Sequence, residues 1–336
     1  MRQIDEQRGG AVPYGRQAVK LMKTSLSTNW CARRVESGEE IADKAIELGF
    51  DELELGFHTT VFQAKGFKRR LGEIPVGSVH AFCPVPVSAP QGYPELYSLA
   101  SPDADARAIA RVHVKKNIEF AASMGADTVV LHAGRVPFSS FFSRSLDSQF
   151  LSEALREAEG DLENRAYAKV LAKAKKRRDA LGTKILDVFM KEIEAIVPVL
   201  EKNGITLAFE NLPYLEGFPD EAEMAEIEKR FDTPLVASWF DTGHDRVRAV
   251  HGWKKDAALS RIPAGMHLND VEKYNDDHFA PGGGKVDFAS LSGMAEKVRH
   301  VVFEPGQHVS ERELVAGIEF WKKISSQGSK TFDSAR

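Results

Sequence analysis

Carboxylate and imidazole side chains of this 336-residue chain gather at the ends of short apolar runs. Glu210 and Asp241 end two successive runs, His267 lies in the next, and Glu304 ends the last. Carboxylates packed together without a counter-cation would repel one another and lose hydration. Carboxylates and neutral imidazoles suit zinc, manganese, iron or cobalt as ligands. The pattern therefore predicts a divalent metal site with acid–base chemistry beside it.

Further polar residues occupy corresponding positions of other runs and their loops: His80, His132, His244, Asp276 and His278. A single histidine at a strand end is more often a buried, hydrogen-bonded residue than a ligand, and Asp-Thr-Gly-His alone could be a turn. The occurrence of so many histidines and carboxylates at or just after the ends of the runs favours one shared site. Four other histidines have no such neighbours, and we expect them in helices, loops or at the surface: His58, His113, His251 and His300.

The apolar runs number eight, and most are nearly continuous, as in strands covered on both faces. They span residues 23–27, 52–55, 76–82, 128–132, 205–210, 235–240, 265–268 and 301–304. Helical patterns lie between or after them at 38–48, 105–124, 186–202, 220–229 and 311–323, several followed by a glycine stop signal. Eight such units predict an α/β fold, a (β/α)8 TIM barrel; a doubly wound open sheet is the alternative. In a barrel, the carboxyl ends of all strands meet at one mouth.

One connection is longer than a barrel helix needs. The fourth and fifth runs are separated by 72 residues, which include an aromatic loop at 137–142, an acidic segment and then a basic one. Both charged segments have a helical pattern. We therefore expect a barrel over 23–325 with a helical insertion at about 137–184, an N-terminal arm at 1–22 that is open to disorder, and a C-terminal tail at 326–336.

Composition narrows the function classes. The net charge of −4 gives no overall basic character for nucleic acid, and 43% apolar with 28% charged residues is ordinary for a globular protein. No apolar run is long enough to span a membrane. Two cysteines cannot form a disulfide framework, so we expect a cytoplasmic location. A homo-oligomer is compatible with the sequence.

The ordered set of polar residues resembles that of the xylose isomerase-like TIM-barrel superfamily, which contains sugar isomerases, sugar epimerases and endonuclease IV. The resemblance implies that Glu210, Asp241, His267 and Glu304 bind a metal ion, with Glu210 and Glu304 as catalytic residues. The larger endonuclease IV pattern holds three zinc ions. Its extra residues match His80, His132, His244, Asp276 and His278. Zinc, manganese, iron or cobalt, at one to three ions per chain, is the implied cofactor.

Two functions compete. In a sugar or sugar-phosphate isomerase or epimerase, the two glutamates move a proton next to a carbonyl. In an endonuclease IV-like enzyme, a multinuclear zinc site cleaves phosphodiesters at abasic sites of DNA. We favour the sugar enzyme because the loops after the first four runs are apolar and aromatic. We expect Trp30, Phe57, Phe82, Tyr93 and the 138–142 loop with Phe141 to enclose a small sugar, with nucleic acid as the less favoured partner.

Overall fold

Eight parallel strands close into a barrel in the computed structural model, which describes residues 23–138, 146–255, 261–274 and 276–333. The strands are β1 (Ser25–Ser27), β2 (Glu52–Leu55), β3 (Val76–His80), β4 (Thr128–Leu131), β6 (Thr206–Glu210), β8 (Val236–Asp241), β9 (Gly265–Leu268) and β10 (His300–Phe303). Their order around the barrel is β1-β10-β9-β8-β6-β4-β3-β2. The predicted barrel is confirmed, and the alternative of an open sheet is wrong.

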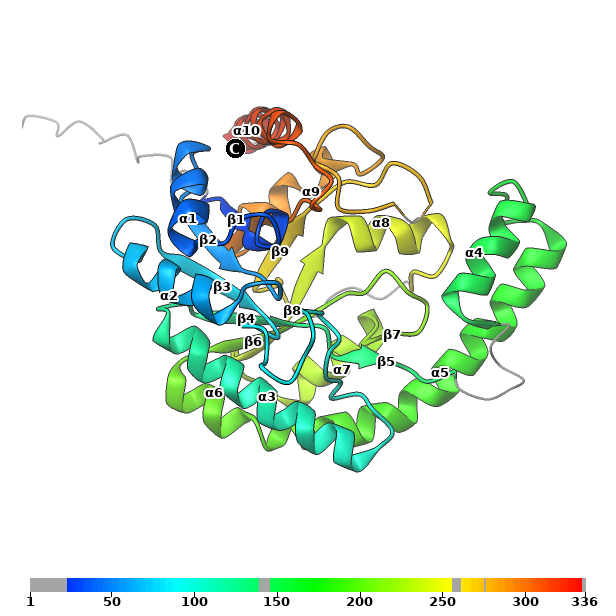
Figure 1. The fold of residues 1–336 in the computed structure, drawn as a ribbon. Coiled ribbons are helices and arrows are strands. Elements are labelled where there is room, and N and C mark those ends of the chain that lie inside the picture. The colour runs from blue at the N-terminus through cyan, green and yellow to red at the C-terminus, as the bar shows by residue number, and fades with distance from the viewer. Residues whose placement is uncertain (1–22, 139–145, 256–260, 275, 334–336) are drawn as a thin grey trace, which may run out of the picture.

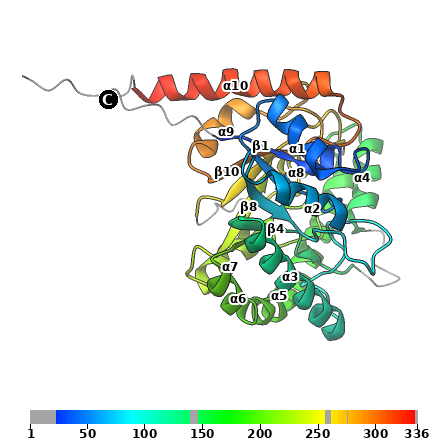
Figure 2. The same cartoon turned by 60° about the vertical axis from the view of Figure 1, so that its left-hand side comes forward.

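Helices form the outer layer of the barrel (Figures 1 and 2). They are α1 (Gly38–Glu47), α2 (Val61–Arg70), α3 (Ala104–Ser123), α6 (Val197–Asn203), α7 (Glu221–Arg230), α8 (Thr242–Val250), α9 (Phe288–Ala295) and α10 (Glu311–Asp333). Side chains of Ser37, Asp103 and Asp220 accept backbone N–H groups at the starts of α1, α3 and α7. Gly204 ends α6 in a left-handed conformation with φ of 66°, as its stop signal predicts.

Two predicted helix boundaries are wrong. The helix expected at 186–202 is interrupted, because α5 (Arg165–Glu194) ends first and α6 begins three residues later. Pro198 lies in the first turn of α6, where its missing N–H costs little, whereas inside a continuous helix it would break a hydrogen bond. The last helix, expected to end at 323, continues to Asp333.

The barrel interior is divided along its axis. Side chains alternate between the inside and the outside of each strand. Val130, Ala208, Trp239 and Val302 form a small buried apolar cluster of residues from β4, β6, β8 and β10. Two residues further along each of these strands, toward its carboxyl end, the next inward-facing residue is polar and lies in the mouth. A dry, packed floor therefore supports the polar mouth.

The long connection forms α4 (Ser148–Glu157) and α5, which extend to one side of the barrel (Figure 1). Only the first part of the acidic segment is helical: α4 ends at Glu157, and Glu159 has a φ of 54° in the turn that follows. Arg178 of α5 is buried and forms ion pairs with Asp220 and Glu223, which fix the helix to α7. A two-stranded sheet of β5 (Gly134–Arg135) and β7 (Gly217–Phe218) joins the loops after β4 and β6.

Cys31 and Cys83 are both buried and carry free thiols. None of the helices within the described residues combines the length and apolar character that crossing a bilayer requires. The predicted arm at 1–22 and the aromatic residues at 139–142, with Phe141, lie outside the described residues.

Candidate metal centre

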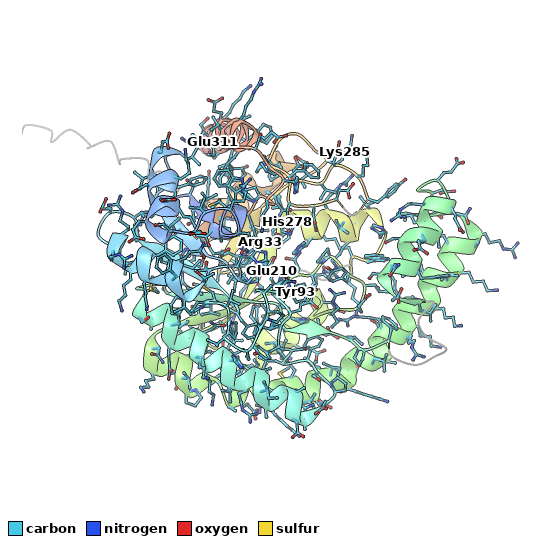
Figure 3. All side chains as sticks on the ribbon, viewed as in Figure 1. Arg33, Tyr93, Glu210, His278, Lys285 and Glu311 are labelled. Carbon is cyan, nitrogen blue, oxygen red and sulfur yellow. The ribbon has the colours of Figure 1, made fainter. Side chains whose placement is uncertain are left out.

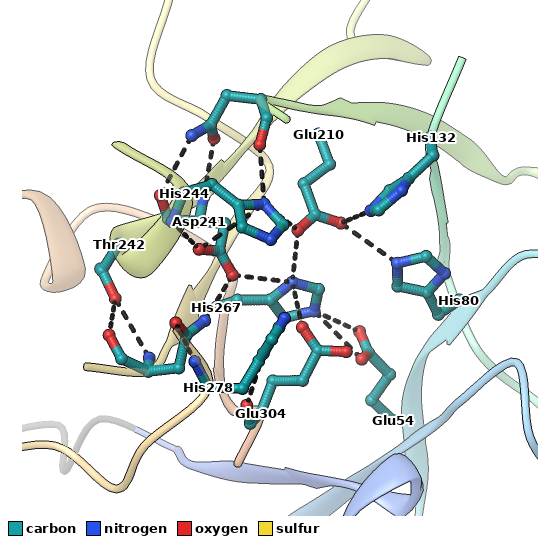
Figure 4. Close-up of polar contacts among 12 residues, drawn as sticks. Glu54, His80, His132, Glu210, Asp241, Thr242, His244, His267, His278 and Glu304 are labelled. Carbon is teal, nitrogen blue, oxygen red and sulfur yellow. Dashed lines mark hydrogen bonds and ion pairs between the residues drawn. The ribbon is translucent and has the colours of Figure 1, made fainter. Parts of the chain in front are cut away.

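Four side chains converge inside the mouth of the barrel (Figure 4). Glu210 ends β6, Asp241 ends β8, His267 lies in β9, and Glu304 follows β10. The four strands are neighbours in the barrel. Side chains of a strand alternate between the inside and the outside, and all four of these residues occupy inward-facing positions. One potential ligand atom from each residue lies within 4.8 Å of the others, and all four residues are buried.

His267 is the centre of this group. Its Nδ1 lies 3.2 Å from Glu210 Oε1, 3.1 Å from Glu304 Oε2 and 3.7 Å from Asp241 Oδ2. Three carboxylates therefore face the same side of one imidazole ring. Ligand atoms gathered around one point in this way can enclose a small cation.

The loop after β8 serves both structure and site. Asp241 caps α8 by accepting the N–H of His244 at 2.7 Å, which is the turn expected from Asp-Thr-Gly-His. The other oxygen of Asp241 accepts a hydrogen bond from Asn269 Nδ2 at 2.6 Å and still faces His267. Gly243 is required because a Cβ there would lie 1.8 Å from Asn269 Oδ1. The cap thus holds Asp241 in its inward position.

Glu210 links the four-residue group to two further histidines. Its Oε2 lies 3.1 Å from His80 Nε2 and 3.2 Å from His132 Nε2. His80 Nδ1 donates to the carbonyl oxygen of Ala81 at 2.9 Å, so Nε2 is the ring nitrogen that faces Glu210 and could bind a metal. His132 Nδ1 lies 3.9 Å from Glu95, which Arg135 holds by hydrogen bonds of 2.6 and 2.8 Å. His80, His132 and Glu210 form a second possible ligand group.

A third possible ligand group differs from the prediction by one residue. His244, Asp277 and His278 bring ligand atoms within 4.8 Å of one another, with Asp277 Oδ2 at 3.7 Å from His244 Nε2. Asp276, which the sequence pattern selected, is exposed and contacts Glu272 through its backbone carbonyl. His278, the next residue, has a φ of 61°, a left-handed conformation. Glu210 and His278 both lie near the middle of the molecule in Figure 3.

Charges in the mouth are strongly coupled. Burial opposes a charge on His267, but Glu304, Glu54 and Glu210 outweigh burial and raise its pKa well above the ordinary value. Burial also opposes ionisation of Glu210, yet His267 and His132 hold its pKa well below the ordinary value. Burial also opposes a charge on His244, but Asp241 and Glu210 outweigh burial and raise the pKa of His244 to about 10. Burial raises the pKa of Asp241.

This donor set fits a divalent transition metal. Among the described residues, the ionic partners of Glu210, Asp241 and Glu304 are all histidines, and no lysine or arginine pairs with them. A histidine can exchange a proton for a metal ion, which a lysine paired with a carboxylate does not do. One nitrogen and three carboxylates could hold zinc, manganese, iron or cobalt.

The described aromatic residues predicted for the pocket differ in their surroundings. Phe57 is half-buried, and its ring contacts His80 at a centroid distance of 5.2 Å. Trp30 is buried, with its indole N–H donating to Val309, and Phe82 packs on Tyr97 beside α3. Trp30 and Phe82 lie beyond the ends of β1 and β3, and the inward alternation of the strands does not continue into the loops. Their part in a substrate pocket stays a prediction. Tyr93 is half-exposed on the loop after β3.

Several residues of the mouth were not predicted. Glu54 in the middle of β2 lies 3.0 Å from His267 Nε2, and Asn29 donates to Glu304 Oε1 at 3.1 Å. Asn269 holds Asp241, as described above. The period-two pattern was a usable signal for Glu54, since it stands two residues after Glu52 in a strand of alternating Glu and Leu. Glu54 precedes the last residue of β2, so a pattern of polar residues at strand ends does not include it.

Three of the four histidines expected in helices, loops or at the surface lie in such segments. His58 is in the loop after β2, His113 is in α3, and His251 caps the end of α8, where it is buried. The expectation is wrong for His300, which is buried at the start of strand β10. Neither His251 nor His300 is among the three possible ligand groups. Their burial is explained by hydrogen bonds, to Val247 and Ser152 for His251 and to Asp127 for His300.

A closed barrel with buried carboxylates and histidines at the carboxyl ends of its strands defines a (β/α)8 protein with a candidate metal centre. A family model described as xylose isomerase-like TIM barrel matches residues 42–324, and the chain belongs to that family. This confirms the resemblance drawn from the sequence.

Solved structures similar to this chain include several named as sugar epimerases. A D-tagatose 3-epimerase-like protein has a TM-score of 0.62 and 20% identity, covering 93% of this chain and 100% of its own. An L-ribulose 3-epimerase has a TM-score of 0.61 and 12% identity, covering 94% and 98%. A 3-keto-D-glucoside 4-epimerase from E. coli has a TM-score of 0.59 and 15% identity, covering 90% and 99%. At these identities the likeness shows the fold.

Among curated proteins, an uncharacterized protein of Methanocaldococcus jannaschii is 27% identical over 129 residues. The match covers 36% of this chain and 42% of that protein, which is less than half of each.

Proposed function

We propose that this chain is a metal-dependent sugar isomerase or epimerase that transfers a proton at the carbon next to a carbonyl. The observation that carries the proposal is the convergence of ligand atoms from Glu210, Asp241, His267 and Glu304 within 4.8 Å at the barrel mouth. The names of the structurally similar epimerases support the same assignment.

Each part of the site has a role in this proposal. The four residues would hold a divalent ion, which supplies polarisation of the carbonyl and the neighbouring hydroxyl of the sugar. Glu210 and Glu304 come from strands separated by β8 and β9, so they approach the mouth from different sides. One glutamate would remove a proton from the carbon, and the other would return it. Phe57 would cover a C–H face of the sugar beside His80.

A second candidate function is supported by the two additional ligand groups. His80 and His132 with Glu210, and His244 with Asp277 and His278, could hold further ions. Two or three metal ions suit phosphodiester cleavage, where they stabilise the attacking and leaving oxygens. The candidate is therefore an endonuclease IV-like phosphodiesterase acting at abasic sites. We favour the sugar enzyme because of the likeness to structures named as epimerases.

Two assays on the same metal-loaded protein decide between the functions. In heavy water, a panel of pentuloses and hexuloses is incubated with the protein and analysed by NMR and mass spectrometry. We expect deuterium to enter a ketose at the carbon next to its carbonyl, and this exchange should stop after chelation. A DNA duplex with one abasic site, incubated in parallel, should stay intact.

The two assays give opposite results for the two candidate functions. Metal-dependent nicking at the abasic site, without exchange into any sugar, would replace the sugar proposal with the phosphodiesterase. Metal analysis of protein purified without chelators adds an independent measurement. One ion per chain favours the isomerase or epimerase, whereas three ions favour the phosphodiesterase.

A further inference from the structure

Glu54 is a buried carboxylate on the opposite side of His267 from the proposed metal site (Figure 4). It lies in the middle of β2, inside the barrel, and its side chain is 0% exposed. Its two oxygens lie 3.0 and 3.1 Å from His267 Nε2. Ser78 of β3 donates its hydroxyl to Glu54 Oε2 at 2.8 Å. Both neighbours therefore fix the position of this carboxylate.

No lysine or arginine among the described residues forms an ion pair with Glu54; His267 is its ionic partner. A carboxylate removed from water loses several kcal/mol of hydration unless partners replace it. A buried strand position in a barrel is usually filled by a branched apolar residue. At Glu54 the contact with His267 and the hydrogen bond from Ser78 replace the lost water, so the carboxylate and the histidine form one buried unit.

The contact determines which nitrogen of His267 faces the mouth. An ionised carboxylate only accepts hydrogen bonds, so Nε2 must carry the proton that lies between it and Glu54. Nδ1 is then left facing Glu210 and Glu304, at 3.2 and 3.1 Å. A metal ligand histidine commonly donates its other N–H to a carboxylate, which sets the tautomer and the ring orientation.

We propose that Glu54 is a positioning residue that holds His267 with Nδ1 directed at a divalent metal ion. This inference rests on the proposed function, since it requires a metal at the four-residue group. Glu54 itself does not belong to that group. The His267 ring lies between them, so Glu54 acts through the histidine rather than as a ligand.

Cobalt(II) binding tests the proposal without any activity assay. The Glu54→Gln variant keeps the shape of the side chain and removes its charge. We expect it to bind Co2+ about 10- to 100-fold more weakly than the wild type, measured by competition with a chelating dye. The visible absorption of bound Co2+ should also change, because it reports ligand geometry. Ser78→Ala, which removes the hydrogen bond to Glu54, should weaken binding by a smaller factor.

Glu228→Gln is the matched control. Glu228 of α7 is also a buried glutamate that accepts a hydrogen bond from a serine, Ser238, but it lies outside the barrel strands. The same substitution there should leave Co2+ affinity and the spectrum unchanged. Circular dichroism and thermal unfolding of the metal-free variants establish that each one folds. If Glu54→Gln fails to fold, Ser78→Ala decides, and unchanged affinity of that variant overturns the proposal.

An Asp241→Asn variant distinguishes failure of this inference from failure of the proposed function. If Asp241→Asn loses Co2+ while Glu54→Gln keeps wild-type affinity and spectrum, the metal site stands and the role of Glu54 is wrong. If Asp241→Asn binds Co2+ as tightly as the wild type, the metal site of the proposed function is wrong, and the role of Glu54 is overturned with it.

Discussion

His267 and His300 stand on neighbouring strands, β9 and β10, but at opposite ends of the barrel interior. His267 faces the mouth and has carboxylates on both sides: Glu54 at Nε2, and Glu210 and Glu304 at Nδ1. His300 faces the base, where its Nε2 lies 2.8 Å from Asp127 and its Nδ1 lies 3.8 Å from Glu52. Each histidine is thus enclosed by acidic groups.

The carboxylates at the two ends have different partners. At the base, Arg299 pairs with Asp127 at 3.2 Å and Lys23 pairs with Glu52 at 2.7 Å. Permanent cations therefore balance the charge there. At the mouth, the ionic partners of Glu54, Glu210, Asp241 and Glu304 among the described residues are histidines alone. Since a histidine can release its proton to solvent and bind a metal ion in its place, the mouth can exchange protons for a cation, whereas the base is a completed structural network.

The strongest test of the difference between mouth and base is to remove one carboxylate charge from each end of the barrel. We expect Glu304→Gln or Glu210→Gln to lower kcat/KM for sugar exchange by about 1,000-fold or more, because each removes a proton-transfer group and a ligand. Glu52→Gln makes the same change at the base and should keep activity close to the wild type. The measurement is deuterium exchange into the reactive ketose. Wild-type activity in either mouth variant would contradict the acid–base assignment.

Metal removal should affect stability through the mouth alone. An ion that binds the folded chain at 100 times its dissociation constant stabilises it by about 2.7 kcal/mol. We therefore expect the chelated protein to unfold at lower temperature, and added Zn2+ or Mn2+ to restore the difference. Added metal should raise the unfolding temperature of Glu52→Gln as much as that of the wild type, whereas it should raise that of Asp241→Asn much less. An equal metal-induced shift in Asp241→Asn would locate the bound ion elsewhere.

The smallest effect is expected at the base. Burial opposes a charge on His300, but the hydrogen bond to Asp127 and the negative charges of Asp127 and Glu52 outweigh burial and raise its pKa. A raised folded-state pKa means that the charged form stabilises the fold fully below the ordinary histidine value of about 6.5, and that this stability is lost as pH rises through the folded-state pKa.

The His300→Gln variant tests this network. We expect it to be less stable than the wild type by roughly 1–2 kcal/mol at pH 6, since one hydrogen bond to a partly exposed carboxylate is weakened. The difference should shrink at pH 9. Urea unfolding at both pH values measures it, and Co2+ affinity should be unchanged. A pH-independent difference would show that packing, rather than charge, explains the contribution of His300.

Periodicity in the sequence was sufficient for the barrel. Continuous apolar runs of strand length, with helices between them and glycine stops after several, leave few ways to bury every face other than a closed sheet. The inward position of His80, Glu210 and Asp241 follows from the same pattern, because a strand end and a period of two fix the direction of a side chain. This is why much of the mouth could be predicted without coordinates.

Where regular structure stops, periodicity predicts nothing. Trp30 and Phe82 lie just beyond strand ends, where the chain turns and the side chain is placed by packing against Val309 or Tyr97. Asp276 and Asp277 are adjacent, and it is the conformation of the loop that brings Asp277, and not Asp276, beside His244 and His278. Loop residues are positioned by contacts that the local sequence does not encode.

The sequence by itself determined the strands, their order along the chain and the acidic, histidine-rich character of their carboxyl ends, because these depend on local periodicity and residue type. Only the tertiary structure decided the partners. Glu54 and His267 are 213 residues apart, and Asp127 and His300 are 173 apart, yet each pair is in contact because the barrel closes between distant strands. Whether a buried carboxylate meets an arginine or a histidine depends on that closure. This difference makes one end of the barrel a candidate metal centre and the other a salt-bridge network.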